Sequence, residues 1–113
     1  MTLAELRERL EDAALTVLDV RTQLEFEGLA GAHCDPRQGH IPGAVNLPLE
    51  RIVACRSLEE VLGVVGLPPG AEIVAYCHSG SRSALAAMAL RSAGYRARNY
   101  PGSWHEWSRE VAD

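Results

Sequence analysis

Short β-branched segments alternate with signals for helix starts along most of this chain of 113 residues. The segments 15–20, 45–47 and 73–76 are mostly apolar and too short for helices, which predicts strands. A further strand is expected over 95–100, after the helix that ends at Gly94. Strands that alternate with helices favour a mainly parallel sheet with helices on both faces. The sequence therefore predicts an α/β fold, in which ligands bind beyond the carboxyl ends of the strands.

Helix starts are marked by hydroxyl residues followed three positions later by glutamate, the capping-box pattern. The pairs are Thr2 with Glu5, Thr22 with Glu25, and Ser57 with Glu60. A further helix is expected over 84–93, which is rich in strong helix formers and ends at Gly94, a natural left-handed residue after a helix. The glycine-rich stretch 28–39 has no periodicity and is expected to form a surface excursion.

Length and charge restrict the possible functions. The chain is long enough for one domain, expected over 1–113, and nearly half of its residues are apolar, at 47%. Its net charge of −4 and the absence of a basic run argue against nucleic acid as a partner. All eleven bases are arginine, so an anionic substrate would meet guanidinium groups or backbone N–H groups.

Location is inferred from the same sequence. No apolar run is long enough to span a membrane, and no leader pattern is present at Met1. The three cysteines contain no CxxC pair, which favours reduced thiols. We therefore expect a cytoplasmic protein without a membrane partner.

Cys77 is the strongest candidate for chemistry. It lies between a predicted strand and a predicted helix that begins near Ser83, and Gly80 gives the intervening loop freedom to curl around the sulfur. Backbone N–H groups and the positive end of a helix dipole stabilise a thiolate. Such surroundings lower a thiol pKa from about 8.5 to about 3.5–7.5. We expect a nucleophilic thiolate that is open to solvent.

Five short motifs together resemble the rhodanese-like sulfurtransferase family. They are 18–21 (LDVR), Glu25-Phe26, 39–44 (GHIPGA), 77–83 (CHSGSRS), and Gly94-Tyr95 followed by 102–104 (GSW). The ending 99–107 is similar to the catalytic half of tandem thiosulfate and mercaptopyruvate sulfurtransferases. The resemblance implies a five-stranded, mainly parallel sheet flanked by helices, and a cysteine that carries sulfur as a persulfide.

The implied reaction has two covalent steps. Cys77 takes sulfur from a small anionic donor such as thiosulfate and passes it to cyanide or a thiol, with a protein sulfur acceptor as a further candidate. The loop residues His78, Ser79, Gly80, Ser81 and Arg82 are expected to form the anion pocket. The reaction requires no metal and no organic cofactor.

Two other functions fit the same loop. A sulfur-carrier or regulatory binding module would receive persulfide from a partner and turn over little with small donors. The related phosphatases and arsenate reductases have a loop one residue longer than the six residues from Cys77 to Arg82, so that function is disfavoured.

Several charged residues near the motifs have two interpretations. Arg82 is either a donor to substrate or a brace tied to a carboxylate. Asp19 and Arg21 support the loop, and a structural salt bridge between them is favoured over a direct role. Glu25 lies where some two-domain relatives have an arginine that faces the substrate. A carboxylate at this position would repel thiosulfate. Arg37 is a candidate to supply the missing positive charge.

The remaining candidates are thiols and hydroxyls. Cys34, beside His33, suggests metal or redox chemistry, although an ordinary loop thiol is favoured. Cys55 is expected to be structural. Ser81 and Ser83 carry hydroxyls that either reach the sulfur or cap the following helix.

Overall fold

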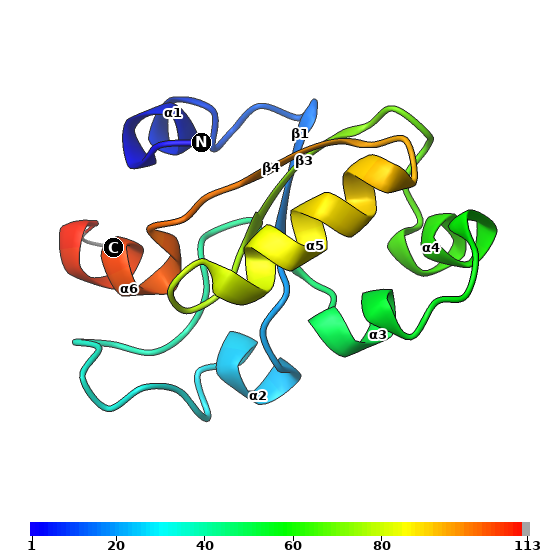
Figure 1. The fold of residues 1–113 in the computed structure, drawn as a ribbon. Coiled ribbons are helices and arrows are strands. Elements are labelled where there is room, and N and C mark those ends of the chain that lie inside the picture. The colour runs from blue at the N-terminus through cyan, green and yellow to red at the C-terminus, as the bar shows by residue number, and fades with distance from the viewer. Residues whose placement is uncertain (112–113) are drawn as a thin grey trace.

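The computed structural model describes residues 1–111. Helices and strands follow one another in the order that the sequence predicts (Figure 1). The elements are α1 (Leu3–Glu8), β1 (Leu15–Asp19), α2 (Gln23–Phe26), β2 (Val45–Asn46), α3 (Leu49–Val53), α4 (Leu58–Val65), β3 (Glu72–Tyr76), α5 (Ser81–Ser92), β4 (Arg96–Asn99) and α6 (Ser103–Glu110).

All neighbouring strands run parallel, in the order β2-β1-β3-β4. Within the described residues the sheet has four strands, so the expected fifth strand was wrong. The excursion 28–39 does not supply it, because glycines and Pro36 interrupt an extended run and the segment closes on itself. For example, the Gln38 side chain donates a hydrogen bond to the Ala32 carbonyl at 2.9 Å.

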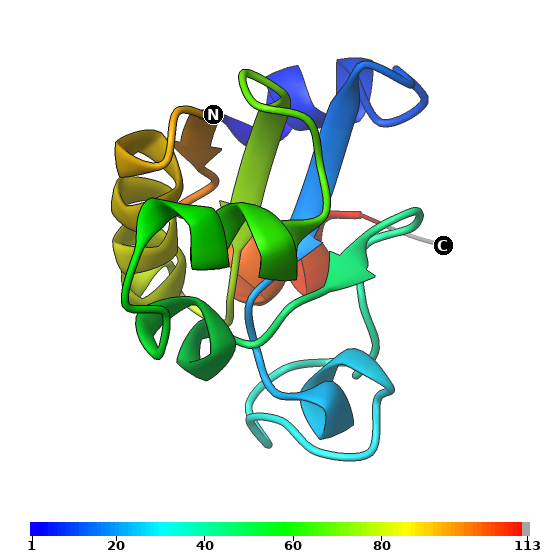
Figure 2. The same cartoon turned by 90° about the vertical axis from the view of Figure 1, so that its right-hand side faces the viewer.

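Helices cover both faces of the sheet, as predicted. Helices α3, α4 and α5 pack on one face, and α1 and α6 pack on the other (Figures 1 and 2). Alternate residues of β3 point to opposite faces: Ile73 and Ala75 join the first core, while Val74 and Tyr76 join the second. This alternation continues past the strand and directs Cys77 into the first core, beneath α5.

The predicted helix starts agree with the structure. Thr2 and Thr22 form complete capping boxes with their glutamates, and the Ser57 hydroxyl accepts a hydrogen bond from the Glu60 N–H. The helix expected near Ser83 begins at Ser81, one half-turn earlier, and Gly94 follows its end with a φ of 96°. None of the helices formed by residues 1–111 is both long enough and apolar enough for a membrane span.

Candidate functional site

The carboxyl ends of the four strands meet at one edge of the sheet. Asp19, Asn46, Tyr76 and Asn99 are the last strand residues there, and Cys77 directly follows Tyr76. Helix α2 and the excursion 28–39 extend beyond the sheet from the end of β1 (Figure 2). The candidate nucleophile therefore lies where parallel sheets place their ligands.

The Cys77 sulfur accepts hydrogen bonds from the start of α5. The Gly80 N–H lies 3.1 Å from Sγ, and the Ser83 hydroxyl lies 3.3 Å from it. Gly80 caps α5 with a φ of 99°, a conformation that turns its N–H back toward the sulfur and that glycine adopts without strain. A Cβ at this position would lie 2.7 Å from the Pro101 carbonyl oxygen, so the loop has no room for a larger residue.

These contacts favour the thiolate. Burial raises the pKa of Cys77, but hydrogen bonds from the Ser83 side chain and from the Ser83, Gly80 and Ser79 backbone outweigh that effect. The pKa of Cys77 is therefore below its ordinary value. The positive end of the α5 dipole acts in the same direction. The sequence-based argument for an activated sulfur agrees with this geometry.

The expectation that the sulfur is open to solvent was wrong. Cys77 is 1% exposed, because its side chain points under α5 into the first core and the fully buried Ser83 lies against it. The sulfur is therefore covered by the residues around it in this structure.

The backbone of the loop is held from its other side by the start of α6. The Ser103 hydroxyl accepts a hydrogen bond from the Cys77 N–H at 3.1 Å and donates one to the Tyr100 carbonyl at 2.8 Å. Ser103 has a φ of 54°, an uncommon value for a residue other than glycine. The N–H groups of Trp104 and His105 bond the carbonyls of Cys77 and His78, each at 2.9 Å. The end of β3 is thus tied to the end of β4.

Arg82 acts as a brace in this structure. Its guanidinium bonds both carboxylate oxygens of Glu25, at 2.9 and 3.2 Å, and so joins α5 to α2. Burial raises the pKa of Glu25, but Arg82 and the Thr22 backbone N–H lower it to about 2. Glu25 is therefore charged and neutralised by Arg82, and the two form a bridge beside the loop.

Asp19 and Arg21 form a buried salt bridge, the interpretation that the sequence favoured. Arg21 Nη2 lies 2.7 Å from Asp19 Oδ2, and the side chains are 1% and 0% exposed. The Tyr76 hydroxyl donates to the same Asp19 oxygen at 2.7 Å and accepts the Ile41 N–H at 3.0 Å. This network joins β1, β3 and the segment that enters β2, which makes it a support for the edge of the sheet.

The other predicted residues divide between the pocket and its surroundings. Ser79 and Gly80 supply N–H groups to the sulfur, whereas Ser81 is exposed on the first turn of α5. Sequence reasoning placed Ser81 in the pocket and left Ser83 open, yet Ser83 is the hydroxyl that reaches Sγ. Ser83 is the third residue of α5, and the third residue of a helix faces the residue that caps its start. This position was the signal in the sequence that could have indicated its contact with the sulfur.

Residues of the excursion contact the loop and α6. The His78 ring extends from the loop toward Asp35, with Nε2 and Oδ2 3.0 Å apart. Arg37 lies over the Trp104 ring and donates a hydrogen bond to the Val111 carbonyl, so it ties the excursion to α6. Asp35 and His105 were not among the sequence candidates, because nothing local links positions 35 and 105 to the loop.

The fold and the site define a class: an α/β protein with a cysteine loop between a parallel strand and a helix, whose N–H groups surround the sulfur. A family model for the rhodanese-like domain matches residues 2–110. The chain therefore belongs to the rhodanese-like domain family, as its motifs indicated.

Relatives with this domain carry sulfurtransferase names. The chain is 32% identical over 110 residues to a thiosulfate sulfurtransferase of Pseudomonas aeruginosa, covering 90% of this chain and 40% of that protein. A crystal structure of a probable thiosulfate sulfurtransferase is 47% identical, with a TM-score of 0.82, and the match covers 97% of this chain and 44% of the other. A human single-domain sulfurtransferase is 28% identical, with a TM-score of 0.71, and the match covers 99% and 96% of the two chains. This chain spans about two fifths of the length of the curated relatives it matches.

Proposed function

We propose that this protein is a sulfurtransferase that carries sulfur on Cys77 as a persulfide. The observation that carries the proposal is the Cys77 sulfur at the start of α5, with hydrogen bonds from the Gly80 N–H and the Ser83 hydroxyl. Relatives named thiosulfate sulfurtransferase support the same reaction class. The donor is a small anion with a sulfane sulfur, such as thiosulfate.

The reaction needs two displacements at sulfur. The Cys77 thiolate attacks the outer sulfur of thiosulfate, a new S–S bond forms, and sulfite leaves with the electron pair of the old bond. Cyanide or a thiolate then attacks the outer sulfur of the persulfide, and the Cys77 thiolate is released. The fixed N–H groups of the loop stabilise both anionic states of the cysteine. His78, Ser79, Gly80 and Ser81 frame the pocket by their backbone.

Arg82 interacts electrostatically with Cys77, so its bridge to Glu25 lies near the sulfur, and we propose that the donor binds by opening this bridge. The bridge lies between α2 and α5, and its side chains are 33% and 16% exposed, so it is partly accessible where Cys77 is not. A thiosulfate anion competes with Glu25 for the Arg82 guanidinium, which offers a bidentate site for oxyanions. Arg82 then changes from a brace to a substrate contact. Asp19 and Arg21 hold the edge of the sheet during this change.

Loading is tested by intact mass. After incubation of the protein with thiosulfate, we expect a gain of about 32 Da, the mass of one sulfur atom, located on Cys77. Cys77→Ser should abolish the gain and keep the fold, while Cys34→Ser and Cys55→Ser are the matched thiol controls. A gain that persists in Cys77→Ser, or no gain in the wild type, contradicts the proposal.

A second candidate function is a sulfur carrier with little turnover of small donors. The enclosure of Cys77 favours it, because a partner protein could open the site more readily than a free anion. Turnover with cyanide separates the two: an enzyme releases thiocyanate over many cycles, whereas a carrier loads once and stops. The phosphatase alternative stays disfavoured by the six-residue loop from Cys77 to Arg82. Hydrolysis of an aryl phosphate would be the result that favours it.

A further inference from the structure

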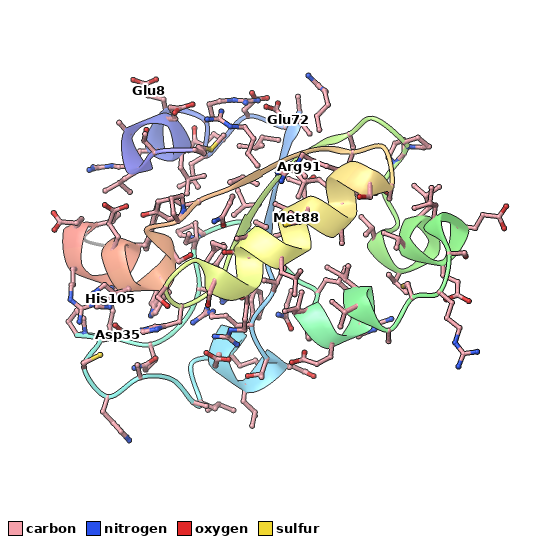
Figure 3. All side chains as sticks on the ribbon, viewed as in Figure 1. Glu8, Asp35, Glu72, Met88, Arg91 and His105 are labelled. Carbon is pink, nitrogen blue, oxygen red and sulfur yellow. The ribbon has the colours of Figure 1, made fainter. Side chains whose placement is uncertain are left out.

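Four side chains with metal-binding atoms meet beside the cysteine loop. Cys34 and Asp35 come from the excursion, His78 from the loop and His105 from α6, and one ligand atom of each lies within 4.8 Å of all the others. Figure 3 shows Asp35 and His105 close together where the excursion approaches α6. Three separate segments thus converge on one point outside the pocket of Cys77.

Two atoms of this cluster are buried and contact each other. They are Asp35 Oδ2 and His78 Nε2, and they lie only 3.0 Å apart. The Asp35 side chain is 0% exposed. An ion coordinated by both atoms would extend this contact to the other two side chains of the cluster.

Neighbouring groups hold these ligands in position. Arg109 donates to Asp35 Oδ1 at 2.8 Å, and this contact directs Oδ2 toward the cluster. Arg109 also bonds the carbonyls of Cys34 and His105, each at 2.7 Å. Supporting contacts of this kind orient the ligands of metal sites. The guanidinium also lies 3.1 Å from His105 Nδ1. The His105 side chain is 48% exposed, so its ring has room to turn from Arg109 to a bound cation while Arg109 keeps its contact with Asp35.

We propose that Cys34 Sγ, Asp35 Oδ2, His78 Nε2 and His105 Nδ1 bind a zinc ion. One sulfur, two nitrogens and one oxygen suit a borderline-soft divalent metal, and they exclude magnesium and calcium, which prefer oxygen ligands. Zinc bonds of about 2.0–2.3 Å at tetrahedral angles separate ligand atoms by about 3.3–3.7 Å. The ligand atoms of the cluster lie within 4.8 Å of one another, and the pair Asp35 Oδ2 and His78 Nε2 is 3.0 Å apart, so the observed separations span that range. The exposed side chains of Cys34 and His105 can move to reach the ideal distances.

The proposal departs from two expectations, that Cys34 is an ordinary loop thiol and that the protein holds no metal. It is separate from the sulfur-transfer proposal, because a metal here is held by the neighbours of Cys77 and not by its sulfur. On binding, Cys34 releases its proton to solvent and a sulfur–zinc bond forms, with no change of oxidation state. A bound ion would join the excursion, the loop and α6.

Cobalt(II) provides a direct readout, because a cobalt–thiolate bond gives a charge-transfer band. The titration uses the 113-residue chain with Cys55→Ser and Cys77→Ser, in which Cys34 is the remaining thiol. Zinc is then added to displace the cobalt. We expect a charge-transfer band, tetrahedral d–d bands and loss of both with zinc. His105→Ala should weaken binding by about tenfold or more, because it removes one of four ligands.

Matched controls separate the cluster from casual binding. His33→Ala changes an exposed histidine of the same excursion outside the cluster and should leave the affinity unchanged. Adding Cys34→Ser to the titrated protein should remove the charge-transfer band. No cobalt or zinc binding at micromolar concentrations would overturn the proposal, as would a band that survives Cys34→Ser. Equal losses of cobalt affinity in His33→Ala and His105→Ala would also overturn the proposal. The test uses His105→Ala and not a substitution of the buried Asp35, because a change at the exposed His105 should leave the fold intact.

Discussion

At the scale of single residues, the state of the sulfur depends on a balance between burial and hydrogen bonding. Burial alone would raise the pKa of Cys77, and the Ser83 hydroxyl and the N–H groups of the loop reverse that effect. Ser83 is fully buried, so its hydroxyl contributes without competition from water. Removing one donor should therefore shift the titration of the thiol measurably.

Ser83→Ala should raise the pKa of Cys77 by about 1–2, because a hydrogen bond to a charged group contributes about 1.5–3 kcal/mol. The thiolate fraction is measured by ultraviolet absorbance against pH in a Cys34→Ser/Cys55→Ser background, with a chelator present. Ser81→Ala is the matched control, because its exposed hydroxyl lies on the same turn of α5. An unchanged midpoint in Ser83→Ala would show that the N–H groups alone set the pKa.

The Glu25–Arg82 bridge should make stability depend on acid pH. The pKa of Glu25 in the folded protein is about 2, below its ordinary value of 4.5. The stabilisation is therefore present above pH 4.5 and is lost as the pH falls toward 2. Between about pH 6 and about pH 3, the free energy of unfolding of the wild type should fall by about 1–2 kcal/mol more than that of Glu25→Gln. This range already allows for solvent screening of the partly exposed Arg82.

Urea unfolding followed by tryptophan fluorescence at the two pH values measures this difference. Glu27→Gln is the matched control, since Glu27 is an exposed carboxylate at the end of the same helix. If the free energy of unfolding changes equally with pH in the wild type and in Glu25→Gln, the bridge does not contribute to stability in solution. Glutamine retains the capping interaction with Thr22, so the comparison isolates the charge.

At the scale of elements, two glycines at the ends of α5 differ in their surroundings. Gly80 and Gly94 have φ values of 99° and 96°. A Cβ at Gly80 would lie 2.7 Å from Pro101 O, whereas a Cβ at Gly94 would have nothing within 4 Å. The backbone strain of a substitution is thus nearly the same at both positions, and only Gly80 adds a steric clash.

Gly94→Ala should cost about 1–2 kcal/mol, the penalty of a left-handed conformation for a residue with a Cβ. Gly80→Ala should cost more and should also displace the N–H that bonds the Cys77 sulfur, so it should raise the pKa of that thiol. The free energy of unfolding and the thiolate absorbance measure the two effects. Equal stability losses and unchanged titration in both variants would contradict the role of Gly80.

The elements themselves were largely predictable, because the signals that define them are local. Threonine and glutamate three residues apart mark the starts of α1 and α2, and Gly94 marks the end of α5. Contacts between distant segments were not predictable. Ser83 reaches the sulfur only because α5 begins at Ser81, and Asp35 meets His78 and His105 only through the path of the excursion. The fifth strand failed because it depended on resemblance and not on a local pattern.

At the scale of the whole molecule, one buried salt bridge supports the edge where the strands end. Asp19 and Arg21 are inaccessible to water, and Arg21 also bonds the Gly39 carbonyl at 2.6 Å and lies over the rings of Tyr76 and Trp104. The network connects the sheet, the excursion and α6. Loss of one partner would leave the other charge buried without compensation.

Asp19→Asn should lower the free energy of unfolding by about 3–5 kcal/mol, the usual cost of breaking a buried ion pair. Arg98→Ala is the matched control, because Arg98 and Glu5 form an exposed pair whose loss should have little effect. Urea titrations of both variants give the comparison. Similar small losses in the two would mean that the buried network relaxes around asparagine.

The enclosure of Cys77 has a consequence for the lifetime of the protein. A thiolate with a lowered pKa is the form that peroxide oxidises, and oxidation beyond the sulfenic state is irreversible for most proteins. Because Cys77 is 1% exposed, the fold also shields its sulfur from peroxide in the surrounding water. The burial that restricts access to the thiolate therefore also protects it from irreversible oxidation.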